Sequence, residues 1–280
     1  VRYIAPWVKD KFTDPAVLVM DEKGQYVIPL LSGHVGGAVR LAGMLAAETG
    51  GEAVVTTATD VQGKFAVDVF AQKSGLCLTD RNEARAISAA VLEGEKTALC
   101  LEYPECRIKG EIPEEIHLCE TWEEAAGYSH RILVADTRRM PEEGTLILRP
   151  KNVVAGIGCR RGISEEVLES GVIRALAENG LAMEQVQALA SIDLKKDEPA
   201  LLALAEKYRI PFTVYPAGEL EKIREVTSRS EFVERTAGVD NVCERAALTC
   251  GRGGKLIQGK RIGESMTSAL VRMPVTLDFT

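Results

Sequence analysis

Apolar and polar positions along the chain predict an alternation of strands and helices. Near the N-terminus, two apolar segments, Ala16–Met20 and Gln25–Leu31, flank a polar turn that ends in Gly24. This pattern is typical of a β-hairpin. Apolar residues at helical spacing predict a helix over Ala38–Thr49, which glycines end, and a short strand over Ala53–Thr57 follows.

The centre of the chain continues the alternation less regularly. The pattern predicts helices near Lys64–Gln72 and over Asn82–Glu93, and it predicts three strands, at Thr97–Leu101, Arg131–Ala135 and Thr145–Leu148. The loops between them are long and contain prolines, which is typical of a small linking domain. We expect no chemistry from this segment.

From Asn152 onward strands and helices alternate clearly. The pattern predicts strands at Val153–Ile157, Gln187–Ile192 and Phe212–Tyr215, separated by helices at Ser164–Glu178 and Pro199–Tyr208. A helix at Val239–Cys250 and strands at Lys255–Gln258 and Ala269–Arg272 complete the predicted elements. Strands joined by helices of this length predict a mostly parallel sheet covered on both faces, hence three layers.

The predicted fold class is therefore α/β, with separate domains built on mostly parallel sheets. At about 150 residues per domain, 280 residues suggest at least two domains. We place them at residues 1–74, 75–149 and 150–280. The chain begins at Val1, and we expect the first domain to lack part of its start.

Composition narrows the class of protein. Apolar residues make up 46% and charged residues 27%, which excludes a disordered chain. The net charge of −7 argues against nucleic-acid binding, and no apolar run approaches the roughly 20 residues that cross a bilayer. The seven cysteines, an odd number, fit free thiols in a reducing compartment, so we expect a cytoplasmic protein.

The first candidate site is the glycine-rich turn from Gly156 to Gly162. It follows a strand and precedes a helix, and it contains Gly158, Arg160 and Arg161. Backbone amides and the helix dipole favour an anion there. The turn lacks the endings of nucleotide-binding loops, so no cofactor is indicated. A tight turn with solvated arginines is the alternative, and Cys159 within it fits a buried thiol better than a nucleophile.

The second candidate site is the loop that joins a strand to the helix at Ala38. Its small residues let the backbone approach a ligand closely, and they are Ser32, Gly33, Gly36 and Gly37. His34 lies among them and titrates near neutral pH, although it can equally cap the helix. Asp60 is a candidate for orienting this histidine, with a helix N-cap as the alternative.

Further candidates are charged residues of the predicted C-terminal domain. Lys195 and Lys196 lie where a strand leads into a helix and can reach an anion beside the arginine turn, or they belong to a solvated charge run. Glu244 is a candidate acid or base on a helix of small residues, unless it points to solvent beside Arg245.

Metal-ligand spacing is poor. Four residues, Cys100, Cys106, His117 and Cys119, fall in a loop-rich segment without a close cysteine pair. We therefore expect no metal site.

Four separated motifs together resemble the CbiG family of anaerobic cobalamin biosynthesis. They start at Pro29 (PLLSGHVGGA), Thr56 (TTATD), Gly156 (GIGCRRG) and Ser191 (SIDLKKDE), and they occur in the family's order over nearly the whole chain. From about Asn152 the chain is also similar to a domain that occurs alone in the aerobic pathway. Family members usually have further sequence before Arg2.

The resemblance implies hydrolysis of the δ-lactone of cobalt-precorrin-5A and release of acetaldehyde to give cobalt-precorrin-5B. It implies arginine and lysine contacts to substrate carboxylates, and cobalt that belongs to the substrate, with no cofactor. The implied partners are the anionic cobalt-corrinoid precursor, a second copy of the chain and neighbouring pathway enzymes, and neither nucleic acid nor membrane. A tetrapyrrole-binding or handover protein without chemistry is one alternative. A phosphosugar- or nucleotide-binding α/β enzyme is another, disfavoured because the nucleotide-binding signatures are absent.

Overall fold

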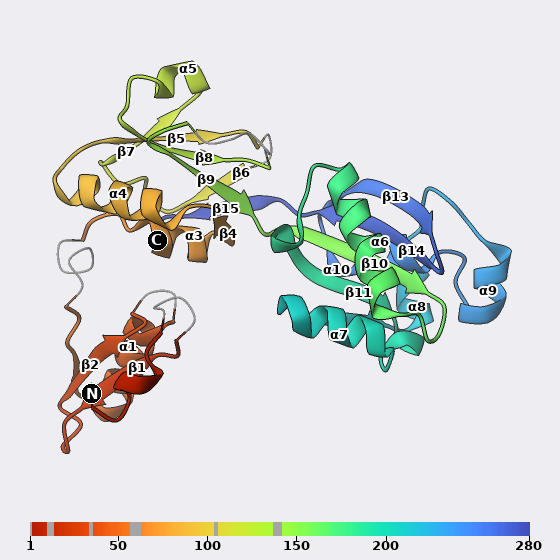
Figure 1. Ribbon diagram of the computed structural model, residues 1–280, viewed down its shortest axis with the longest axis horizontal. Helices are drawn as coiled ribbons and strands as arrows, with labels where there is room; N and C mark the ends of the chain where they lie inside the picture. Colours follow the sequence, from red (N-terminus) through yellow and green to blue (C-terminus); the bar gives the residue numbers. More distant parts are fainter. Residues whose placement is uncertain (1, 10–13, 34–35, 57–62, 104–105, 137–141) are drawn as a thin grey trace.

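The computed structural model describes residues 2–9, 14–33, 36–56, 63–103, 106–136 and 142–280, and it forms three units (Figure 1). Figure 1 shows the N-terminal unit in red beneath a middle unit in orange to yellow-green, and a C-terminal unit in green to blue to one side. The α/β class predicted from the sequence is confirmed, because strands and helices occur in all three units and parallel strand pairs occur in every sheet.

The N-terminal unit contains the predicted hairpin. Strands β1 (Val17–Met20) and β2 (Tyr26–Leu31) are antiparallel, and the short β3 (Glu52–Ala53) adds a parallel edge to β2. Helix α1 spans Ala38–Thr49, as the apolar pattern predicts, and ends at Gly50 in the left-handed conformation. The buried core of this unit is small and consists of Val27, Ala42 and Ala46.

The middle unit is built on a five-stranded sheet in the order β4-β9-β8-β5-β7. Only β4 is antiparallel to its neighbour. Its strands and helices are α3 (Val67–Lys73), β4 (Leu76–Leu78), α4 (Arg81–Leu92), β5 (Thr97–Leu101), β7 (Ile116–Cys119), α5 (Trp122–Ala125), β8 (His130–Val134) and β9 (Thr145–Pro150). The Asp80 carboxylate caps α4 by accepting the amides of Asn82 and Glu83.

The middle unit includes segments from outside residues 75–149. The last strand, β15 (Val275–Asp278), pairs in parallel with β6 (Cys106–Lys109), and its Val275 and Leu277 are buried in the core of the middle unit. Phe65 and Phe70 also pack in that core. The chain therefore enters the middle unit before the predicted boundary at residue 74 and returns to it after leaving the C-terminal unit.

The C-terminal unit has the predicted three layers. Its sheet runs β12-β11-β10-β14-β13, with the first three strands parallel. One buried cluster joins the sheet to α6 and α7, and another joins its opposite face to α8, α9 and α10. These strands and helices are β10 (Val153–Cys159), α6 (Glu165–Glu178), β11 (Val186–Ile192), α7 (Pro199–Tyr208), β12 (Phe212–Tyr215), α8 (Ala217–Leu220), α9 (Glu231–Ala237), α10 (Val242–Cys250), β13 (Lys255–Gly263) and β14 (Met266–Arg272).

The end of this unit differs from the sequence prediction in two ways. The helix predicted from Val239 begins at Val242, where the side chain of Asn241 caps it, and α9 precedes it as a separate helix. The hairpin of β13 and β14 extends beyond both predicted strands. Within the described ranges, no helix combines the length and the apolar character that crossing a membrane requires.

Candidate functional site

The arginine turn connects the end of β10 to the start of α6. The amide of Arg160 donates to the carbonyl oxygen of Ser265 at 2.9 Å, which ties the turn to the hairpin. Gly162 adopts a φ of +73°, which favours glycine, and Ser164 caps α6 by accepting the amide of Val167 at 3.3 Å. Both arginine side chains are exposed, so they are available to a ligand.

A buried carboxylate joins this turn to the lysine segment. Glu198 is 4% exposed, and its Oε1 accepts the amide of Gly162 at 2.8 Å while its Oε2 lies 3.1 Å from Nζ of Lys195. The Lys195 side chain is itself 14% exposed. Glu198, at the start of α7, therefore fixes the arginine turn and the lysine segment relative to each other.

These segments border a pocket of about 720 Å³. Arginine and lysine residues at its edge are Arg160, Arg161, Lys195 and Lys260, and its apolar walls include Leu194, Val233, Val242, Ile262 and Met266. Gly158 also lines the pocket, and a Cβ there would meet the hydroxyl of Thr267 at 2.7 Å. Apolar walls with a cationic rim suit a large, largely apolar ligand that carries peripheral anions.

Lys196 faces a second hollow rather than this pocket. That hollow has a volume of about 640 Å³ and is lined by Arg161, Lys196, Asp197 and neighbouring residues. The Lys196 side chain is 69% exposed and lies 4.0 Å from the Asp197 carboxylate. The structure thus brings Gly158, both arginines and Lys195 together, and it places Lys196 beside them.

Lys260 is a pocket residue that the sequence analysis missed. It lies in the part of β13 beyond the predicted strand, after Gly259, whose Cβ position would be 2.5 Å from the hydroxyl of Thr227. In the sequence, only the adjacent basic pair Lys260 and Arg261 after a glycine could have indicated an anion-binding residue here. Nothing in that signal indicates that the hairpin folds back over the arginine turn.

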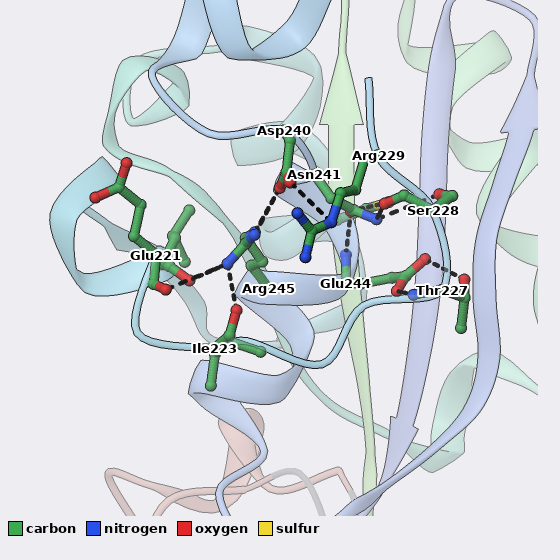
Figure 2. A network of polar contacts seen from close by, with 11 residues as sticks. Glu221, Ile223, Thr227, Ser228, Arg229, Asp240, Asn241, Glu244 and Arg245 are labelled. Carbon is green, nitrogen blue, oxygen red and sulfur yellow. Dashed lines mark hydrogen bonds and ion pairs between the residues drawn. The ribbon is translucent and has the colours of Figure 1, made fainter. Parts of the chain in front are cut away.

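Glu244 is buried and fully hydrogen-bonded (Figure 2). Its carboxylate accepts the amide and hydroxyl of Thr227, both at 2.6 Å, and the amide of Lys260 at 2.7 Å. Burial alone would raise the pKa of this carboxyl, but these hydrogen bonds outweigh burial and hold the pKa of Glu244 below its usual 4.5. This geometry indicates that Glu244 anchors both the loop before α9 and strand β13. Its predicted role in proton transfer stays a prediction.

Arg245, next along α10, holds the same loop from the other side. Its guanidinium forms an ion pair with Asp240 at 2.6 Å and donates to the carbonyl oxygens of Glu221 and Ile223 (Figure 2). The side chain of Asn241 adds a 2.9 Å hydrogen bond to the carbonyl oxygen of Ser228. Residues of α9 line the pocket, so this polar network under the loop supports one pocket wall.

The N-terminal glycine loop folds tightly. Ser32 has a φ of +56°, its hydroxyl is buried, and we find no partner for this hydroxyl among the described residues. A Cβ on Gly36 would lie 2.2 Å from that of Ser32, so only glycine fits there. Gly37 has a φ of +80°, and the amide of Val39 donates to the carbonyl oxygen of Gly33 at 2.9 Å.

His34 and Asp60, the two other catalytic candidates, lie outside the described residues. The described residues that line the 720 Å³ pocket all belong to the C-terminal unit, and the described part of the glycine loop is not among them. Figure 1 shows the N-terminal unit apart from the C-terminal unit. The described structure therefore does not bring the arginine turn and the glycine loop into one site.

Cys159 borders the pocket as a thiol, because burial raises its pKa to about 11. Of the four candidate metal ligands, Cys106 lies apart on β6, in the pair of strands formed with β15. His117 and Cys119 lie together on β7 with a third residue, Glu124, which the spacing did not indicate.

Comparisons with known proteins agree with the resemblance. Family models described as Cobalamin synthesis G N-terminal, Cobalamin biosynthesis central region and Cobalamin synthesis G C-terminus match residues 1–60, 65–150 and 153–271. Cobalt-precorrin-5A hydrolases of Priestia megaterium and Salmonella typhimurium are each 36% identical to the chain, which covers 76% and 75% of their lengths. These matches extend over 98% and 95% of the chain.

Other relatives match part of the chain or are more distant. Protein CobE of a Sinorhizobium species is 36% identical over 45% of the chain and 82% of its own length. A crystal structure of CobE matches 44% of the chain and 93% of its own length at 34% identity, with a TM-score of 0.42. That of a cobalamin biosynthesis protein G homolog from Sulfolobus solfataricus matches 97% of the chain and 78% of its own length at 24% identity, with a TM-score of 0.38. On the two hydrolase matches, the chain belongs to the CbiG family of cobalt-precorrin-5A hydrolases.

Proposed function

We propose that this chain opens the lactone of cobalt-precorrin-5A and releases acetaldehyde, and that the pocket of the C-terminal unit holds the macrocycle. Family membership supports the reaction class. The observation that carries the proposed binding site is the pocket of about 720 Å³ with a cationic rim, in a chain whose net charge is −7. A local cationic rim in an acidic protein indicates a specific anionic ligand rather than general attraction to anions.

The pocket suits the two chemical parts of a corrinoid precursor. Its apolar walls cover the faces of a planar macrocycle, and Arg160, Arg161 and Lys260 receive peripheral carboxylates. Lys195 already has Glu198 as a counterion, so its remaining N–H groups contribute directed hydrogen bonds more than net charge. Cobalt arrives and leaves within the substrate.

The reaction needs proton transfers for which the basic side chains of this rim are poorly suited, because they are protonated near neutral pH. A base removes a proton from water, which attacks the lactone carbonyl, and the ester C–O bond breaks to give a carboxylate and a hydroxyl group. The hydroxyl then loses its proton, its carbon–carbon bond breaks as the aldehyde C=O forms, and the electron pair on the ring carbon takes up a proton. We assign the base to His34, oriented by Asp60, because imidazole has an unperturbed pKa of about 6.5. This assignment requires the N-terminal unit to approach the pocket of the C-terminal unit when the substrate is bound.

A handover protein without chemistry is the second candidate. The described residues that line the pocket include no histidine and no carboxylate, so this pocket by itself lacks the side chains that most often act as general bases near neutral pH. A binding protein would keep the rim and the apolar walls and would release its ligand unchanged.

Anaerobic incubation of the full chain with cobalt-precorrin-5A distinguishes the two. We expect acetaldehyde in proportion to the substrate consumed, together with a change in the visible absorption of the macrocycle. An absorption change on binding with no acetaldehyde would establish the handover protein instead. No interaction with the intermediate would contradict both functions.

A further inference from the structure

A cluster of three potential metal ligands lies in the middle unit, away from the pocket. The ligand atoms of His117, Cys119 and Glu124 all lie within 4.8 Å of one another. None of these residues has a part in the proposed reaction. They combine an imidazole, a thiol and a carboxylate, the three side-chain types that bind zinc in proteins.

The fold itself brings these residues together. His117 and Cys119 are two positions apart on β7, so their side chains lie on the same face of the strand. The chain then turns at Thr121, whose hydroxyl accepts the amide of Glu124 at 3.2 Å and starts α5. That turn directs Glu124 back to β7, where its Oε1 lies 2.9 Å from Nε2 of His117.

Neighbouring contacts hold the cluster in place. The His117 ring stacks on Tyr128 with centroids 5.4 Å apart, and Oε2 of Glu124 accepts the amide of Glu120 at 3.0 Å. Such supporting contacts orient metal ligands in known sites. Cys119 is 4% exposed, whereas the side chains of His117 and Glu124 are 44% and 42% exposed, so a cation can reach the cluster from solvent.

A second thiol lies beside the first. Cys100 of β5 is paired with Cys119 of β7 in the parallel register, and it is also buried. Its Sγ lies 3.5 Å from the carbonyl oxygen of Thr121, at the turn that positions Glu124. Cys100 lies outside the 4.8 Å cluster but next to Cys119, so it becomes the fourth ligand of tetrahedral zinc only after its side chain rotates toward the other three.

We propose that His117, Cys119 and Glu124, with Cys100 as fourth ligand, bind one zinc-like divalent cation that joins β7 to α5. Zinc bonds of about 2.0 to 2.3 Å place tetrahedral ligands about 3.4 to 3.8 Å apart, so rotation of side chains closes the 4.8 Å cluster. A full set of protein ligands is typical of a structural site rather than a catalytic one. The cation would stabilise the edge of the middle sheet.

The test uses the full reduced chain, stripped with a chelator and titrated with Zn²⁺ against a chromogenic competitor. We expect one equivalent to bind and the melting temperature to rise, because a ligand that binds only the folded state stabilises it. Co²⁺ serves as a spectroscopic probe, since thiolate coordination gives it an intense charge-transfer absorption. Absence of binding to the wild-type chain would overturn the proposal.

Variants locate the site. Cys119→Ser should abolish the thiolate absorption and weaken Zn²⁺ binding at least 100-fold. Removing a residue that only supports a metal ligand already costs about 10- to 100-fold in affinity, and removing a ligand itself should cost no less. Cys106→Ser is the matched control, because Cys106 lies apart on β6, and it should bind like the wild type. Unchanged binding by Cys119→Ser would overturn the proposal.

Glu124→Gln covers the case in which replacing a buried cysteine unfolds the chain. The Glu124 side chain is 42% exposed, so this variant should keep the fold and still bind Zn²⁺ more weakly. Equal affinity of Glu124→Gln and the wild type would contradict the ligand set. Acetaldehyde release plays no part in these measurements, so their outcome is independent of the proposed reaction.

Discussion

The carboxylate of Glu198 accepts the backbone amide of Gly162 across a distance of 2.8 Å. The two residues are 36 positions apart, at the beginning of α7 and in the turn before α6. Because the same carboxylate also holds Lys195, one buried side chain sets the spacing between the arginine turn and the lysine segment.

Replacing Glu198 with Gln should lower the free energy of unfolding by roughly 1–3 kcal/mol, since the amide leaves buried Lys195 without its counterion. Chemical denaturation measures the change. Asp197→Asn is the control, because the Asp197 side chain is 85% exposed, and it should have little effect. Equal stability of the two variants would show that the Glu198 contacts contribute nothing.

The double variant Arg160→Gln and Arg161→Gln should bind the corrinoid intermediate much more weakly and melt at nearly the wild-type temperature. Each charged contact contributes about 1.5–3 kcal/mol, and both side chains are exposed in the unliganded chain. A titration followed by the visible absorption of the macrocycle gives the affinity. Arg174→Gln, on the exposed face of α6, is the control. Unchanged affinity in the double variant would contradict arginine contacts to the substrate.

Lys260→Gln should weaken binding of the intermediate about tenfold, which corresponds to about 1.4 kcal/mol. The reason is that Lys260 borders the 720 Å³ pocket, whereas its stabilising contact to Glu244 uses the backbone amide, which the variant keeps. Lys196→Gln is the comparison, because Lys196 faces the neighbouring hollow. A larger loss for Lys196→Gln than for Lys260→Gln would place the substrate in that hollow instead.

Glu244→Gln should destabilise the chain at pH 7 by roughly 1–3 kcal/mol, because Gln cannot accept from all three donors of Thr227 and Lys260. The folded-state pKa of Glu244 lies below 4.5, so its ionised form stabilises the fold above that pH, and this contribution disappears as the pH falls through the folded pKa. The difference between wild type and variant should therefore shrink below pH 4.5.

Unfolding curves at pH 7 and at a series of values below 4.5 measure this difference. Glu221→Gln, with an exposed side chain, is the control. A difference between wild type and Glu244→Gln that stays constant with pH would show that the ionised carboxylate is not the stabilising form.

His34→Ala should keep the affinity for the intermediate and lose about 10² to 10⁴ in the rate of acetaldehyde release, which is the usual contribution of general base catalysis. Binding and rate are measured separately, by absorption titration and by aldehyde assay. His130→Gln, in the middle unit, should keep the wild-type rate. If His34→Ala keeps it too, His34 is a turn residue and Asp60 becomes the next candidate.

Local sequence determined the strands and helices of this protein to a large extent. The Ala38–Thr49 helix, the Pro199–Tyr208 helix and the hairpin before Leu31 form where apolar spacing, a proline and glycines predict them, because these signals act between near neighbours. The basic groups at the ends of β10 and β11 follow from the same logic, since parallel strands of one sheet end at the same edge.

Contacts between distant segments decided the rest. Nothing near Val275 indicates that this strand leaves the C-terminal unit and pairs with Cys106, and nothing near Lys260 indicates that β13 borders the arginine turn. Glu244 was a candidate for proton transfer or for solvent exposure, and only its burial and its three hydrogen-bond donors showed that it anchors the loop before α9. A residue's own neighbours set its backbone conformation, whereas its exposure and its partners depend on which remote segments pack against it, so tertiary structure alone decides them.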